Sequence, residues 1–192
     1  FNGEQLTMEE IHTGLRKGVL DGELIPVLVG CATKNIGLHT MLSMLVDYLP
    51  NPSDLNPICG LDDKENPTIR KTLDEEPFSA FVFKTIIDPY SGISSIFKVN
   101  SGVLHQQDEV YISGLNKTIT VNQLFTICGN KQTPVSEVHA GDIAVINKVD
   151  GLETSMTLCT PKSRIEYEKI DFPTPVYYKS IITKSKNDDD KL

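Results

Sequence analysis

Residues 78–104 constrain the fold more than any other stretch, because they predict a β-hairpin. Apolar residues alternate over 78–83 and again over 96–104, which is the period of a strand with one buried face. Asp88-Pro89 and Gly92 stand between these two runs, and Pro and Gly are typical of the turn that joins paired strands. We therefore expect an antiparallel pair of strands at the centre of a β domain.

The β pattern continues over residues 77–160. Short runs rich in apolar and β-branched residues alternate there with turns that contain Gly or Asn. The expected strands are 79–87, 94–99, 109–112, 118–128, 142–149 and 156–159. Several short strands at this spacing favour a closed barrel or a sandwich.

The first fifty residues predict a different architecture. Thr7 and Glu10 have the spacing of a capping box, and the helix they open ends near Gly22. Residues 25–29 (Ile-Pro-Val-Leu-Val) are typical of a buried strand, and an apolar stripe predicts a second helix over 37–49. Helix, strand, loop and helix form part of an α/β layer.

Two further segments flank the β region. Residues 50–76 carry four prolines and a cluster of acidic residues, which predicts a linker or irregular crossing rather than a helix. Residues 176–183 predict a strand that begins a further structural unit after the β region, and residues 184–192 look like the approach to a helix.

Composition excludes several classes of function. The formal net charge is −8, which argues against non-specific nucleic-acid binding, because that binding depends on cations that meet phosphates. The sequence contains no run of about 18 apolar residues, so it predicts no transmembrane helix. No signal-peptide pattern opens the chain. The four cysteines are far apart and none forms a C-x-x-C pair, so we expect free thiols in a reducing cytosol and no zinc site.

Other candidate sites are weak. Asp188-Asp189-Asp190 is more typical of a solvated chain end than of a metal site, since consecutive residues rarely converge on one ion. No arrangement of Ser, His, Asp or Cys predicts nucleophilic catalysis. We therefore expect no catalytic residue and no metal ligand in this chain.

Asn147-Lys148-Val149-Asp150 has the N-K-x-D pattern with which GTPases recognise guanine. However, no G-x-x-x-x-G-K-[ST] loop is present to hold phosphates. The other candidate nucleotide-binding loop, at residues 30–34, also precedes N-K-x-D in this chain. In a GTPase domain the corresponding loop follows N-K-x-D. A β-turn is therefore the favoured interpretation.

That second loop, Gly30-Cys31-Ala32-Thr33, is the better nucleotide-binding candidate. It resembles the last guanine-contacting loop of elongation factor G, which usually reads Gly-Ser-Ala, with Cys31 in the place of Ser. Backbone N–H groups face the guanine carbonyl in such a loop, so a tight turn matters more than side-chain identity. The resemblance implies that Gly30, Cys31, Ala32 and Thr33 contact the nucleotide; an ordinary strand-to-helix turn is the alternative.

The resemblance to elongation factor G extends over nearly all of the chain. It includes the segments 46–50, 74–78, 78–104, 137–144, 157–159 and 172–176. It implies a mainly β fold with a translation-factor-type β-barrel, domain II, at 77–162. Residues 1–52 would be the C-terminal α/β tail of a P-loop GTPase domain, and 53–76 a linker. Residues 163–192 would connect to the first strand of a ferredoxin-like domain III.

The resemblance also implies a function. The chain would be an internal fragment of a cytoplasmic, ribosome-associated translational GTPase, which uses GTP and Mg²⁺ to drive translocation. Its partners would be small-subunit RNA and protein, with no membrane or DNA partner. The fragment alone should hold neither GTP nor Mg²⁺ and should not hydrolyse GTP, because the phosphate-binding loop is missing.

Several residues depart from the family pattern. Lys98-Val99-Asn100 stands where Arg-Val-Tyr is usual, and Asn122-Gln123 where Gly-Arg is usual. Arg makes forked phosphate contacts that these residues cannot copy, so the standard contacts with ribosomal RNA are in question and a divergent paralogue is an option. The sequence also leaves open a tetracycline-resistance-type ribosomal protection protein, which residues 101–105 would suit, and a non-catalytic ribosome-binding module.

Overall fold

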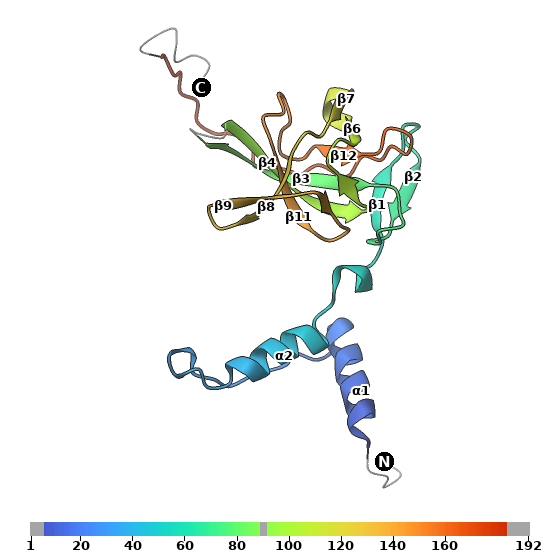
Figure 1. The fold of residues 1–192 in the computed structure, drawn as a ribbon, viewed down its shortest axis with the longest axis vertical. Helices are drawn as coiled ribbons and strands as arrows, with labels where there is room; N and C mark the ends of the chain where they lie inside the picture. Colours follow the sequence, from blue (N-terminus) through green and yellow to red (C-terminus); the bar gives the residue numbers. More distant parts are fainter. Residues whose placement is uncertain (1–5, 89–91, 184–192) are drawn as a thin grey trace.

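The computed structural model describes residues 6–88 and 92–183. Figure 1 shows a β domain at one end and two helices at the other, joined by an irregular segment. The helices are α1 (Met8–Leu20) and α2 (Leu38–Tyr48), and short 3₁₀ turns lie at η1 (Ala32–Lys34), η2 (Pro52–Asp54) and η3 (Ser113–Leu115).

Within the described residues, eight antiparallel strands form the main sheet in the order β7-β6-β12-β3-β4-β11-β8-β9. Their bounds are β3 (Ser79–Asp88), β4 (Gly92–Ser101), β6 (Glu109–Ile112), β7 (Lys117–Thr120), β8 (Leu124–Cys128), β9 (Lys131–Val135), β11 (Ile143–Asn147) and β12 (Thr157–Cys159). Two short pairs accompany the sheet: β1 (Ile58–Leu61) with β2 (Pro67–Arg70), and β5 (Leu104–His105) with β10 (Glu137–Val138). The predicted mainly β fold is confirmed.

The core of the β domain lies on the inner face of this sheet. Its fully buried side chains come from most of its strands: Val82, Phe97, Val99, Leu104, Val110, Ile112, Leu124, Val138 and Leu158. Burying one such side chain contributes about 1.5–3 kcal/mol, so the alternating pattern of residues 78–104 supplies much of the stabilising free energy.

The predicted hairpin is confirmed as β3 and β4, which pair from Ser79↔Ser101 to Asp88↔Gly92. Its expected turn includes residues 89–91, which lie outside the described residues. The single strand expected at 118–128 is wrong, because β7 and β8 are separate. Val121 leaves the strand path: its N–H donates to the Asp108 carbonyl at 3.0 Å and its own carbonyl accepts from the Gln107 N–H at 2.7 Å.

Both predicted helices are confirmed. The capping box of α1 is formed, since the Glu10 N–H donates to Thr7 Oγ1 at 3.3 Å and the Thr7 N–H donates to Glu10 Oε2 at 2.8 Å. Helix α2 begins after Gly37, whose φ of 75° is favoured only for glycine. No helix of the described residues is long and apolar enough to cross a membrane.

The strand expected at residues 25–29 is wrong. These residues form no strand, and Ile25, Val27 and Val29 are 85%, 86% and 93% exposed. A strand needs a neighbour to accept its backbone hydrogen bonds, and no other strand of the described chain lies beside this one. The apolar stripe of α2 also lacks a neighbour that would cover it in the described chain: Leu42 is 52% and Val46 is 79% exposed.

The interpretation of residues 50–76 as a linker missed a hairpin. Strands β1 and β2 pair from Ile58↔Arg70 to Leu61↔Pro67. The Leu61 N–H donates to the Glu166 carbonyl at 2.9 Å and the Glu166 N–H donates back to the Leu61 carbonyl at 2.8 Å. Distant residues therefore hold this hairpin, which local sequence could not reveal.

The strand expected at 176–183 is also absent from the described residues. Val176 and Ile182 are 96% and 88% exposed, and the segment has no strand partner here that could satisfy its backbone. The helix approach expected at 184–192 lies outside the described residues.

Candidate functional site

The loop Gly30–Thr33 is a closed turn between the extended segment and α2. The Cys31 N–H donates to the Ile36 carbonyl at 2.9 Å, and the Ile36 N–H donates back at 3.0 Å. A Cβ added to Gly30 would lie 2.8 Å from the Ile36 carbonyl oxygen, which is too close for any other residue. The tight turn that the sequence predicted is therefore present, and glycine is required in it.

Two side chains of this loop, those of Cys31 and Thr33, interact with each other. The sulfur of Cys31 lies 3.4 Å from Thr33 Oγ1. The hydrogen bond with the Thr33 side chain, together with the Lys34 backbone N–H, lowers the pKa of the Cys31 thiol. The thiol therefore stabilises the loop conformation around residues 31–34.

Most backbone N–H groups of this loop are engaged within it. The N–H groups of Lys34 and Asn35 donate to the carbonyls of Cys31 and Ala32 at 3.2 Å each, and the Thr33 N–H interacts with the Cys31 thiol. Phosphate binding needs a wider set of N–H groups and a cation. No cluster of three or more His, Cys, Asp or Glu side chains within residues 6–88 and 92–183 could hold a metal ion. The assignment of Gly30, Cys31, Ala32 and Thr33 stays a prediction.

The N-K-x-D residues lie in the β domain, in a different part of the molecule from that loop (Figure 1). Asn147 ends β11, where Nδ2 donates to Gln132 Oε1 at 2.9 Å and Oδ1 accepts from Ser94 Oγ at 2.7 Å. The Leu152 N–H then closes a turn on the Val149 carbonyl at 3.3 Å. Asn147 therefore supports the sheet, and the turn that follows spans residues 149–152, two residues beyond the position at which the β-turn was expected.

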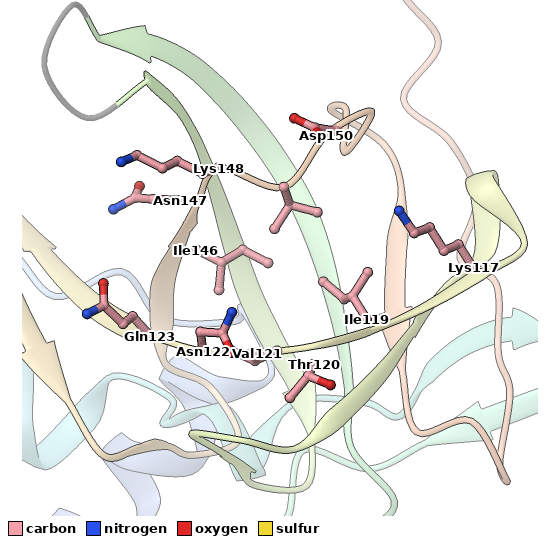
Figure 2. A pocket seen from close by; sticks show the side chains of 11 residues that line it. Lys117, Ile119, Thr120, Val121, Asn122, Gln123, Ile146, Asn147, Lys148 and Asp150 are labelled. Carbon is pink, nitrogen blue, oxygen red and sulfur yellow. The ribbon is translucent and has the colours of Figure 1, made fainter.

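The same residues border a pocket of about 500 Å³ that sequence analysis did not predict. Figure 2 shows Ile119 and Ile146 towards its middle and the polar side chains around them. The lining residues are Lys117, Ile119, Thr120, Val121, Asn122, Gln123, Ile146, Asn147, Lys148, Val149 and Asp150. No local sequence pattern signals this pocket, because residues within 117–123 and 146–150 line it from separate parts of the chain.

A chain of imidazoles and carboxylates lies elsewhere on the β domain. His139 Nδ1 is 2.9 Å from Asp74 Oδ2, and His139 Nε2 is 3.6 Å from Glu137 Oε1. His105 bridges Glu137 and Asp108 at 3.2 and 3.3 Å. Hydrogen bonding to Asp74 raises the pKa of His139, and hydrogen bonds from the Ala140 N–H and His139 lower the pKa of Asp74. This contact joins the segment before β3 to the β10–β11 turn.

The β domain has a match among known protein families. Residues 77–161 match the family model described as elongation factor G domain 2. This region therefore resembles a translation-factor domain II, and it is called domain II below. Its eight-stranded antiparallel sheet agrees with that assignment, and the part of the resemblance that concerns domain II is thereby confirmed.

A solved structure extends the likeness beyond domain II. A protein of Thermus thermophilus, known from its crystal structure, is similar over 88% of this chain with a TM-score of 0.63 and 23% sequence identity. At that identity the likeness is one of fold alone. The chain spans 22% of the length of that protein.

Proposed function

We propose that this chain is part of a ribosome-associated translational GTPase resembling elongation factor G, in which GTP hydrolysis drives translocation. The observation that carries the proposal is the match of residues 77–161 to elongation factor G domain 2. The helices that precede this domain in the same chain, and the fold likeness over 88% of the chain, support a multidomain arrangement around it.

Each part of the chain has a role in this proposal. Domain II contacts RNA and protein of the small ribosomal subunit. The loop Gly30–Thr33 contacts the guanine base through its backbone. In this proposal the phosphates of GTP and the Mg²⁺ ion are bound by residues outside this chain, because the chain contains no G-x-x-x-x-G-K-[ST] loop. The protein works in the cytoplasm.

The test is GTP hydrolysis by the full-length protein with and without ribosomes. We expect strong stimulation by ribosomes, and no hydrolysis by the 192-residue chain used alone as the control. Absence of stimulation, with intact binding to ribosomes in sedimentation, would instead identify a non-catalytic ribosome-binding module.

A second assay separates translocation from ribosome protection. Polypeptide synthesis is measured in a translation extract that lacks its own translocation factor, and again in a complete extract inhibited by tetracycline. We expect the protein to restore synthesis in the first extract. Restoration only in the second would identify a ribosomal protection protein.

A further inference from the structure

The pocket on domain II opens beside an edge strand. Strand β7 stands at one end of the sheet order and pairs only with β6 among the described strands. Its other edge faces the pocket, across which lies the end of β11 with residues 146–150. An open strand edge presents unpaired backbone groups and is a template for an added extended segment.

The floor of the pocket is aliphatic. Ile119 and Val149 are half-buried and Ile146 is buried, so an apolar side chain of a partner would find contacts there. The lining contains no aromatic residue. Binding of single-stranded nucleic acid depends on stacking of bases on aromatic side chains, and this floor therefore favours a peptide over an RNA nucleotide.

The rim of the pocket carries two cations and one anion. Lys117 and Lys148 are exposed, and neither forms a salt bridge among the described residues. The carboxylate of Asp150, which lines the same pocket, offsets part of the positive charge of the two lysines. The pocket is thus locally positive in a chain of net charge −8, and it attracts carboxylates.

The remaining polar groups suit a backbone ligand. The side-chain amides of Asn122 and Gln123 are exposed at the pocket, next to the point where the chain leaves β7. An amide side chain both donates and accepts hydrogen bonds, so it can satisfy the backbone of a segment that runs along the strand edge.

We propose that this pocket binds an extended peptide segment of a partner protein, in which an apolar side chain is flanked by acidic residues. The segment pairs with the open edge of β7. Its apolar side chain packs on Ile119 and Val149, and its carboxylates meet Lys117 and Lys148. This interaction goes beyond the proposed GTPase function and does not depend on it.

The probe is a fluorescein-labelled peptide of sequence Asp-Glu-Val-Ile-Val-Glu-Asp with blocked ends, titrated with the 192-residue chain in a fluorescence anisotropy assay. We expect saturable binding that weakens with salt. Reversing both cations (Lys117→Glu with Lys148→Glu) should weaken binding by about tenfold or more, from two lost charge contacts and added repulsion. Lys64→Glu, in the turn between β1 and β2, is the matched control and should leave the affinity unchanged.

Two further arms separate the contributions. Lys117→Met with Lys148→Met removes the charges without adding repulsion and should also weaken binding, while circular dichroism checks that both double variants keep the fold. Peptides N-methylated at alternate residues test strand addition: one of the two alternating sets should abolish binding and the other should not.

Three results would overturn the proposal. The first is no binding of the acidic peptide. The second is equal binding to the wild type and to the lysine variants. The third is displacement of the peptide by an oligouridine of the same charge that itself binds more tightly, which would make the pocket an RNA site.

Discussion

At the scale of single residues, the contact between His139 and Asp74 couples two segments through protonation. The 2.9 Å distance between Nδ1 and Oδ2 joins the segment before β3 to the turn before β11. The Ala140 N–H also donates to Asp74 Oδ1 at 3.0 Å, so this one carboxylate fixes two successive residues of the turn.

The pH dependence of this contact follows from the two pKa shifts. The raised pKa of His139 means that its stabilising contribution is complete below about pH 6.5 and is lost as the pH rises through the raised value. The lowered pKa of Asp74 means that its contribution is complete above about pH 3.9 and is lost as the pH falls through the lowered value. The contact is therefore strongest in the window between these limits.

We predict that His139→Gln lowers the unfolding temperature more at about pH 5.5 than at about pH 8.5, because only the protonated imidazole gains from the charge of Asp74. In an NMR titration, Asp74→Asn should lower the pKa of His139, whereas Asp62→Asn, in the β1–β2 turn, should not move it. An unchanged His139 pKa in the Asp74 variant would contradict the prediction.

At the scale of elements, a buried arginine attaches the hairpin β1–β2 to the segment that follows domain II. Arg70 is 9% exposed. Its guanidinium donates to the Ser163 hydroxyl at 2.7 Å and to the Ser163 carbonyl at 3.3 Å. The Nε atom of Arg70 is buried without a hydrogen-bond partner in the described structure, so its desolvation offsets part of the stabilisation that the other hydrogen bonds of the guanidinium provide.

We predict that Arg70→Ala lowers the free energy of unfolding by about 1–3 kcal/mol. The substitution removes the charged hydrogen bonds to Ser163 and leaves a space where the guanidinium was, so that the polar groups of Ser163 lose their partner. The exposed neighbour Lys71 is the control, and Lys71→Ala should change it by less than about 0.5 kcal/mol. Urea unfolding followed by circular dichroism measures both. Equal effects of the two substitutions would show that the hairpin is not held by Arg70.

The sequence predicted an element correctly when the partner that it pairs with is close in sequence, and failed when that partner is distant or is not part of the described chain. The β3–β4 hairpin was predictable because its alternation is long and its partner is adjacent in sequence. The pair β1–β2 was missed because Leu61 is held by Glu166, a residue distant in sequence. The strand expected at Ile25 to Val29 failed for the opposite reason: its apolar pattern was correct, but no neighbouring strand is present in the described chain. The pocket was missed because its two sides come from β7 and from the end of β11, which are distant both in sequence and in the sheet order and meet only in the folded domain.

At the scale of the whole molecule, the helices and domain II differ in packing. Arg16 links α1 to the last turn of α2 and to η2, since it donates to the Asp47 carbonyl and to Asp54 Oδ2 at 2.7 Å each. His12 also stacks on Tyr48 and hydrogen-bonds to it. The apolar faces of both helices remain largely exposed, whereas domain II has a contiguous buried core.

We therefore predict that the helices open independently of domain II. In hydrogen exchange followed by mass spectrometry, amides of α1 and α2 should exchange much faster than those of β4 and β11, because local opening of the helices exposes little additional apolar surface. Amides of the exposed 25–29 segment serve as the fast-exchanging reference. Equal protection of α2 and β4 would show that the chain unfolds as one cooperative unit.

The sheet order has a consequence for folding during synthesis. Strand β3 pairs with β4, which follows it at once, and also with β12, which pairs Thr157 with Phe81. Local pairing forms early and distant pairing late, because a long loop must close first. One edge of β3 therefore stays unpaired until the ribosome has released the segment that contains Thr157. A pause in translation between these two points would leave that strand edge open to aggregation or to chaperones.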